Sequence, residues 1–540
     1  VILLWQMYMG SKHPPRIPDA GPADTGLAAH AGLDGEKTGK KEEDQNLTQD
    51  ESPEQQEQQE DARYEEETFK LSNNFFEAVF TNKGGRLKSF ELKRYYLARI
   101  PHKRVNLVPD NDSTLAVVLQ NRIYKFSGSE RYVFSEVSEK RVVLEHTSLS
   151  GVVIRKEFSV SGNYEITLNV RVINNTDKDF IFKPSLLLSD SALKGGLTKE
   201  DLNSSLEEYY HPLCLANDAL FDGRDLKKGS ISKSMEGKIN WLSSASRYFI
   251  SAVIPIDQKI TMCRFASDEN YNFLAELVYP EMKAETKKET LFSYRLYLGP
   301  KGYSMLKKIG SGLDRAVDFG WLAVLCIPLL YLLSLFYSFV HNYGIAIILL
   351  TIIIKLISIP FTQKSMKSMQ ELQKLKPKLD ELQKKYKDNR EKLNEEMMRL
   401  YREHGVSPFG GCLPMLLQMP IWFALYRMLS NSVELYQAVF IPGWINDLSS
   451  KDPYYILPVL LGAGTFLQQK MTPTTMDSTQ AKVMLYFMPA FLTFIMISLP
   501  SGLTLYIFVS SVLSIVHQVY MNRTNQINQI QSKNTREEEK

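Results

Sequence analysis

The chain has 540 residues, with 64 Lys and Arg against 61 Asp and Glu. This length excludes a single compact core, and two or three structural units are expected. The near balance of charge argues neither for nor against a nucleic-acid partner. The four cysteines lack the short paired spacings of a zinc site or a CxxC redox motif, so no metal and no cofactor are predicted.

The N-terminal region has the pattern of an anchor followed by a linker. Residues 1–10 are apolar but cover only about half of the roughly 20 residues that cross a bilayer. We expect a transmembrane anchor whose upstream half is missing, although the remnant of a cleaved signal peptide has the same pattern. Residues 11–68 are rich in Gln, Glu, Asp, Pro and Gly, which predicts a disordered linker.

Residues 69–300 have the pattern of an all-β domain. Apolar and polar residues alternate in short runs such as 165–172, and turn-forming residues such as 174–177 separate the runs. We therefore predict a large antiparallel β-sandwich. Cys214 and Cys263 both lie in it. Their separation in sequence does not give their distance in space, so a disulfide and two free thiols are both open at this point.

Six apolar blocks follow Asp318 and predict an α-helical polytopic membrane core. The blocks are residues 319–340, 342–362, 412–431, 454–469, 483–499 and 502–520. If the anchor starts inside the cell and all six blocks span the bilayer, the stretch 364–403, with 12 Lys/Arg and 8 Asp/Glu, lies outside. Because basic segments favour the cytoplasm, we expect 319–340 to be an interfacial helix on the outer face. Five spans then remain within 342–523.

This topology places 364–403 and the C-terminal tail, 524–540, in the cytoplasm and the β domain outside. One observation opposes it, because a group of basic residues precedes block 319–340 and would lie outside: Lys301, Lys307, Lys308 and Arg315. Within 364–403, apolar residues recur every three or four positions and Asp388-Asn389 supplies a turn. The pattern predicts a charged helical hairpin with Pro377 in its first turn. Its charge suits ribosomal RNA, anionic lipid or a translocase equally.

Lys355 interrupts the apolar block 342–362 and has two interpretations. Its side chain either extends to the cytoplasmic interface, about 9 Å away along the helix, or points into a water-filled cavity that attracts an acidic or polar part of a client. Thr351, four residues earlier, lies on the same helix face. Gln418, in block 412–431, is either another inward-facing group or an ordinary interhelical hydrogen-bond partner.

The sequence contains no phosphate-binding Gly-rich loop, HExxH helix or GxSxG turn, so no enzyme is predicted. A secondary transporter that binds a small anion at Lys355 is the main alternative. Transporters often carry inverted repeats, and no second Lys-bearing span matches 342–362. We therefore predict no small-molecule substrate.

Three motifs within 340–523 closely resemble the YidC insertases, whose relatives work in mitochondria and chloroplasts. They are residues 407–414 running into 418–422, then 452–458, and 500–506. The β domain followed by an interfacial helix resembles the Gram-negative branch, which has a large periplasmic domain. The resemblance implies five helices around a hydrophilic groove that contains a positive charge.

The charge, usually Arg in the family, matches Lys355, which keeps the charge but loses the planar fork of Arg. Thr351, Gln418 and Tyr506 match further client-contacting groove positions. The resemblance also implies a multi-pass protein of the bacterial inner membrane that inserts and folds nascent membrane proteins in the lipid bilayer. It implies cooperation with the Sec translocon and contact with the ribosome through 364–403 and the tail.

Overall fold

The structure is a computed structural model. It describes residues 65–97, 102–108, 114–120, 125–126, 128–192, 209–228, 232–257, 259–387, 389–405, 413–471 and 478–538. The expected anchor, residues 1–10, and most of the expected linker lie outside the described residues. So do residues 406–412, which include the first six residues of the first family motif, and Asp388 of the expected turn.

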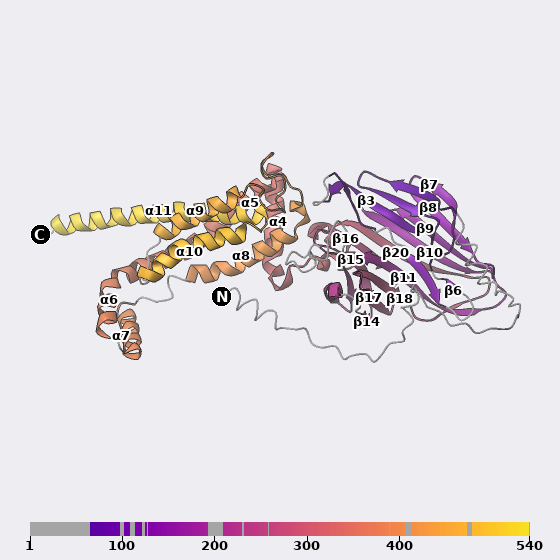
Figure 1. Cartoon of the computed structure of the whole chain (residues 1–540), viewed down its shortest axis with the longest axis horizontal. Coiled ribbons are helices and arrows are strands. Elements are labelled where there is room, and N and C mark those ends of the chain that lie inside the picture. Colours follow the sequence, from indigo (N-terminus) through magenta and orange to yellow (C-terminus); the bar gives the residue numbers. More distant parts are fainter. Residues whose placement is uncertain are drawn as a thin grey trace, which may run out of the picture. The chain divides into compact units, whose positions relative to one another are not determined.

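The strands between Thr68 and Pro300 form three sheets (Figure 1). In spatial order, the first contains β1 (Thr68–Ser72), β2 (Phe76–Thr81), β3 (Arg86–Tyr96) and β4 (Arg104–Asn106). The second contains β13 (Ala219–Asp222), β12 (His211–Ala216), β15 (Ile239–Ala245), β16 (Phe249–Pro255), β20 (Glu289–Pro300), β10 (Glu165–Asn174), β9 (Val152–Val160), β8 (Arg141–Thr147) and β7 (Val133–Ser138). The third contains β14 (Ser232–Glu236), β17 (Met262–Ser267), β18 (Asn272–Val278), β11 (Phe180–Ser191), β5 (Ala116–Gln120) and β6 (Lys125–Phe126), and β19 (Met282–Ala284) pairs with β11.

The strand pattern explains why the sheets stack. Along β10 every second side chain is buried, from Ile166 to Val172, because successive residues of a strand point to opposite faces. β10 pairs antiparallel with β9 and β20, and the other strand pairs are antiparallel as well. Between the two larger sheets, the Ser244 hydroxyl of β15 donates to Asp190 of β11 at 2.6 Å. The predicted antiparallel β-sandwich is confirmed.

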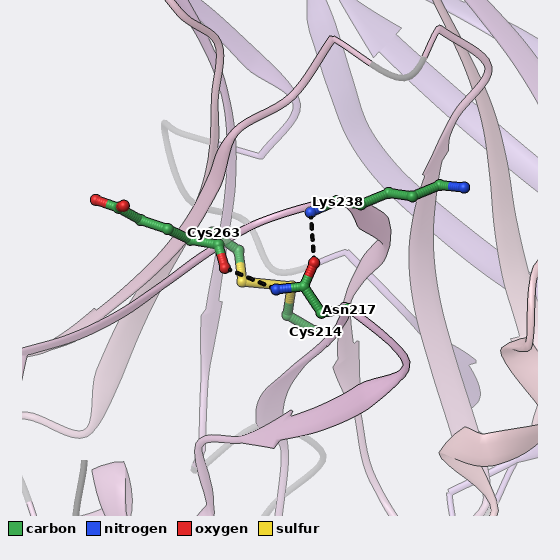
Figure 2. The surroundings of a disulfide bond; sticks show 5 residues. Cys214, Asn217, Lys238 and Cys263 are labelled. Carbon is green, nitrogen blue, oxygen red and sulfur yellow. Dashed lines mark hydrogen bonds between the residues drawn. A yellow bond between two sulfur atoms is a disulfide. The ribbon is translucent and has the colours of Figure 1, made fainter.

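A disulfide joins Cys214 of β12 to Cys263 of β17, so it links the nine-stranded sheet to the seven-stranded sheet. Both side chains are fully buried, with Cα atoms 6.8 Å apart. Figure 2 shows Asn217 beside the bridge, where its side chain accepts from the Lys238 N–H at 2.9 Å. The same side chain donates to the Glu236 carbonyl at 3.1 Å. The pairing that the sequence left open is therefore a covalent tie between two layers.

The helices follow the β domain. They are the short η2 (Arg224–Lys228) inside that domain, then α3 (Tyr303–Ile309), η3 (Leu313–Ala316), η4 (Gly320–Leu322), α4 (Ala323–Val340), α5 (Tyr343–Lys374), α6 (Lys376–Lys385), α7 (Arg390–Glu403), α8 (Leu413–Asn431), η5 (Val433–Leu435), α9 (Ile456–Met471), α10 (Ser478–Met496) and α11 (Ser501–Glu538). Among the described residues, three segments are long and apolar enough to cross a membrane: Gly320–Val340, Tyr343–Lys374 and Ser501–Thr524.

The chain turns sharply between α4 and α5, and in Figure 1 α4 runs across the long helices. His341 has a φ of 53°, a left-handed conformation that ends α4. The Asn342 side chain then caps α5 by accepting from the Ile345 N–H at 3.1 Å. The rings of Tyr337 and Tyr343 stack across this corner, 3.9 Å apart. The cap of α5 and the stacked tyrosine rings therefore fix the angle between α4 and α5.

The first long helix extends further than its apolar residues do. α5 continues through Pro360 into the charged stretch and ends at Lys374, twelve residues beyond the expected apolar block. The break falls at Leu375, and Pro377 lies at the start of α6, as the sequence indicated. Leu372 and Leu375 pack against Tyr401 of α7, so the junction between α5 and α6 is held against α7.

An ionic cluster lies where the β domain meets the helices. Asp318 lies 3.1 Å from Arg224 of η2 and 3.9 Å from Arg427 of α8. Burial disfavours its charged form, but these two guanidinium groups outweigh burial and hold the pKa of Asp318 below its usual value. Lys301 is buried nearby and donates to the Ser246 carbonyl at 2.5 Å. At least one basic residue that opposed the expected topology therefore belongs to the packed β domain.

Candidate functional site

Lys355 lies on the inward face of α5. Its neighbours Leu356 and Ile357 are 55% and 67% exposed, so they form the outward face of the helix. The Lys355 ammonium points away from them and donates to the Ser514 hydroxyl of α11 at 2.8 Å. An ammonium carries three donors, and this is the one hydrogen bond recorded for it within the described part of the chain. Two donors therefore have no such bond there.

α11 presents a polar strip to this interior. Residues four or three apart share one helix face, and the strip consists of Tyr506, Ser510, Ser514 and His517. The hydroxyl of Ser514 donates in turn to the Ser510 carbonyl at 2.8 Å. Tyr506 and Ser514 are eight residues apart, so this part of the strip is about 12 Å long.

The outward side of the same helix is apolar. Its exposed side chains are Val512, Val516 and Tyr520, at 40%, 60% and 64% exposure. α11 is therefore amphipathic along the segment that is apolar enough to span a bilayer. In lipid, such a helix turns its polar face towards neighbouring helices or water.

Gln418 of α8 joins the strip at Tyr506. The Tyr506 side chain is 2% exposed, and its hydroxyl is hydrogen-bonded to the side chains of Gln418 and Ser510. Three separate helices, α5, α8 and α11, thus contribute to one line of polar groups. Three of the four residues singled out from the sequence, Lys355, Gln418 and Tyr506, meet along it.

Thr351 is placed differently. It is fully buried one turn before Lys355, but its hydroxyl donates to the Ile347 carbonyl of its own helix at 2.6 Å. A hydroxyl bonded to the preceding turn has little capacity left to donate elsewhere. Thr351 therefore shapes this face of α5 without joining the polar line through a recorded side-chain contact.

Several polar residues were not singled out from the sequence. Ser510, Ser514 and His517 lie within an apolar block, where short polar side chains attract little notice. Their spacing of four and three residues, in phase with Tyr506, is the signal that would have identified them. His517 faces the charge of Lys355, and its Nε2 atom is buried without a hydrogen-bond partner. On α9, the buried Gln469 Oε1 also lacks one.

The chemistry of the site is that of polar recognition. Among the described residues, no group of three or more His, Cys, Asp or Glu side chains is placed to hold a metal. The ammonium and the unpaired polar atoms favour interaction with polar or anionic groups, because a buried donor or acceptor without a partner is costly.

Comparison with known proteins gives the family. Residues 68–332 match the model of the YidC periplasmic domain, and residues 335–529 match that of the 60Kd inner membrane protein. The membrane protein insertase YidC of Geotalea daltonii is 37% identical over 473 residues, covering 84% of this chain and 86% of that protein. The chain belongs to the YidC family. The YidC of Geotalea uraniireducens is 38% identical over 467 residues, with 84% and 86% covered.

A crystal structure of an active YidC insertase is also similar. It is 20% identical, covers 84% of this chain and 92% of that chain, and superposes with a TM-score of 0.36. The two YidC family models meet between residues 332 and 335, inside α4. Together they span the β domain and the apolar helices.

Proposed function

We propose that this YidC family protein inserts membrane proteins by receiving polar segments of a client along the line of polar groups between α5, α8 and α11. Membrane protein insertion is the activity of the family, and it requires no covalent chemistry. The nascent membrane protein is the substrate and the inner-membrane bilayer is the surrounding solvent. Placing a charged or polar group in hydrocarbon costs several kcal/mol, and a polar line through the membrane lowers that cost.

The observation that carries the proposal is the incomplete pairing of Lys355. Its one recorded hydrogen bond, among the described residues, goes to the neutral Ser514 hydroxyl. A neutral acceptor leaves the positive charge uncompensated, so an acidic or polar client segment gains by approaching it. Once this segment has crossed, the apolar client helix moves into lipid, driven by the hydrophobic effect.

We place the β domain in the periplasm and residues 364–403 and the tail in the cytoplasm. The basic residues of α6 and α7 support this orientation. The disulfide of the β domain supports it independently, because such bonds persist in oxidising compartments. Five spans, α5 and α8 to α11, follow from this topology. α4 then lies along the outer face, and its course across the long helices supports that position.

The charged hairpin, 364–403, and the tail, 524–540, are the proposed contacts for the ribosome. The exposed basic side chains of α6 and α7 give the hairpin the charge that ribosomal RNA attracts. Cooperation with the Sec translocon belongs to the same proposal, since a groove open to lipid can receive a helix that leaves a neighbouring channel. The hairpin is then the first part of the protein that a client meets.

The test is insertion of a single-span client with an acidic translocated segment into liposomes containing the purified protein. Protease protection reports insertion. We expect wild type and Lys355→Arg to insert the client and Lys355→Ala to lose at least about tenfold in rate, because removal of one opposite charge costs roughly 1.4 kcal/mol or more. Lys259→Ala, an exposed lysine of the β domain, is the matched control and keeps full activity.

Two outcomes contradict the proposal in different ways. Wild-type liposomes that protect no more client than empty ones would refute insertion by this protein alone. Equal activity of Lys355→Ala and wild type would leave insertion intact but remove the charge from the mechanism. A client with a neutral translocated segment separates these cases, since it depends little on Lys355.

A further inference from the structure

A cleft lies between the β domain and the outer ends of the membrane helices. Its volume is about 700 Å³, within the usual range of small-molecule sites, about 300–1,000 Å³. Five tyrosines line it: Tyr95, Tyr164, Tyr297, Tyr343 and Tyr436. The cleft therefore has a wall rich in tyrosine, together with a few charged groups, and it is separate from the polar line of Lys355, Ser514 and Tyr506.

The hydroxyls of two of these tyrosines are engaged elsewhere. Tyr297 donates to the Pro300 carbonyl at 2.7 Å, and Tyr436 donates to the Tyr96 carbonyl at 2.6 Å. Because these two hydroxyls already donate to carbonyl groups, the two tyrosines present mainly their ring surfaces to a ligand in the cleft. The rings also contact one another, as with Tyr95 and Tyr436 at 6.4 Å. The face of an aromatic ring attracts a cation through the ring quadrupole, so a cavity lined by such rings favours a positively charged ligand group.

Charged groups of both signs complete the lining. Glu434 of η5 is partly buried, and no ion pair joins its carboxylate to a cation among the described residues. Burial raises the pKa of Glu434, and a cation beside the carboxylate would offset that penalty. Lys308 of α3 also lines the cleft and is exposed. Arg295, by contrast, is occupied, since it donates to the Ile309 carbonyl at 2.8 Å.

The position of the cleft relates it to the membrane surface. Tyr343 is the first residue of α5, and Glu434 follows the end of α8 by three residues. On the proposed topology, on which this step rests, both helices leave the bilayer here, at the level of the outer phospholipid head groups. Tyrosines concentrate at that level in membrane proteins.

We propose that this cleft binds the head group of phosphatidylethanolamine, with the primary ammonium at Glu434 among the tyrosine rings and the phosphate at Lys308. A zwitterionic head group matches the two opposite charges and the aromatic wall at once. The ammonium donates hydrogen bonds to the carboxylate, which a quaternary choline cannot do. Phosphatidylglycerol has the phosphate but no cation, so it uses only half of the site.

The experiment is native mass spectrometry of the full-length protein in a neutral detergent, titrated separately with phosphatidylethanolamine, phosphatidylcholine and phosphatidylglycerol. We expect phosphatidylethanolamine to bind at least about tenfold more tightly than phosphatidylglycerol, because one charged hydrogen bond distinguishes them. Glu434→Gln should lose that preference and leave phosphatidylglycerol binding unchanged. Lys308→Gln should weaken both lipids, and Glu391→Gln, exposed on α7, should change neither.

Equal binding of the three lipids to wild type, or an unchanged preference in Glu434→Gln, would overturn the proposal. So would displacement of bound phosphatidylethanolamine by a lysine-rich peptide at equimolar amounts, because the site would then be a peptide site. No client is present in this measurement. A protein that binds the lipid but fails to insert a client therefore contradicts the proposed function alone, and one that inserts but shows no lipid preference contradicts this inference alone.

Discussion

Two lysines in the protein show how differently a buried charge can be accommodated. Lys156, inside the β domain, is fully buried, with its ammonium 2.6 Å from the Gly84 carbonyl and 4.7 Å from the centre of the Tyr132 ring. Within the residues that the structure describes, Lys355 has one hydrogen-bond partner, the neutral hydroxyl of Ser514. Lys156 is enclosed by the fold, whereas the ammonium of Lys355 has N–H donors that make no hydrogen bond to the described residues. This difference supports the recognition role that we propose for Lys355 and a structural role for Lys156.

Lys156 makes the stability of the β domain depend on pH. Burial lowers the pKa of Lys156 to about 7, below its ordinary value. Between pH 7 and 10 the unfolded chain then binds more protons than the folded one, so stability rises with pH across that window. Thermal unfolding of the full-length protein followed at pH 7, 8.5 and 10 measures this slope. Lys156→Met should flatten it, while exposed Lys238→Met should leave it unchanged.

The candidate site was only partly predictable from single residues. A lysine within an apolar block is conspicuous, and Lys355 stood out for that reason. Ser510 and Ser514 were missed because a serine costs little in a membrane helix and its importance depends on the partner across the interface. The Cys214–Cys263 pair was likewise undecidable, since only the stacking of the two sheets brings those positions to 6.8 Å.

Among the elements, strands were easier to predict than helix ends. Alternation along 165–172 follows directly from the two faces of β10. The apolar block 342–362 does not give the end of α5, because apolarity stops near residue 362 while the helix continues. The following residues, rich in Lys, Gln, Met and Leu, are strong helix formers that continue to Lys374.

The disulfide between β12 and β17 should contribute substantially to the stability of the sandwich. It closes a segment with a sequence separation of 49, for which the chain-entropy model gives about 4 kcal/mol. We expect Cys214→Ala/Cys263→Ala to lower the free energy of unfolding by about that amount. Urea unfolding with and without a reductant measures it. The reductant should destabilise wild type and leave the double variant unaffected, and a wild type insensitive to reduction would contradict the assignment.

At the scale of the whole molecule, Asp318 connects the β domain with the helices. It pairs with Arg224 on one side and Arg427 on the other, and its carbonyl accepts from the Asn431 side chain at 2.9 Å. A depressed carboxyl pKa stabilises the folded state above the unfolded pKa, about 4, and this contribution is lost as pH falls. The cluster therefore couples the two regions at neutral pH.

Asp318→Asn tests that coupling. We expect a loss of about 1 kcal/mol or less at pH 7, because the side chain is 35% exposed and solvent screens it. The difference in the free energy of unfolding between this variant and wild type should be smaller at pH 3.5, where the carboxylate of wild type contributes less. Calorimetry in detergent at both pH values makes the comparison, with Asp314→Asn, an acid four residues away, as the control. If Asp318→Asn lowers the free energy of unfolding by the same amount at both pH values, packing and not charge matters at this position.

The covalent tie between the two large sheets also orders the maturation of the protein in time. On the topology that we propose, a thiol pair kept reduced in the cytoplasm closes only after the β domain has been exported. Strands β12 and β17 thus become permanently joined late, when the intervening chain has already crossed the membrane. On that topology, the β domain of a newly made copy is exported without its disulfide, and the oxidation state of this bond distinguishes the copies that have completed their own translocation.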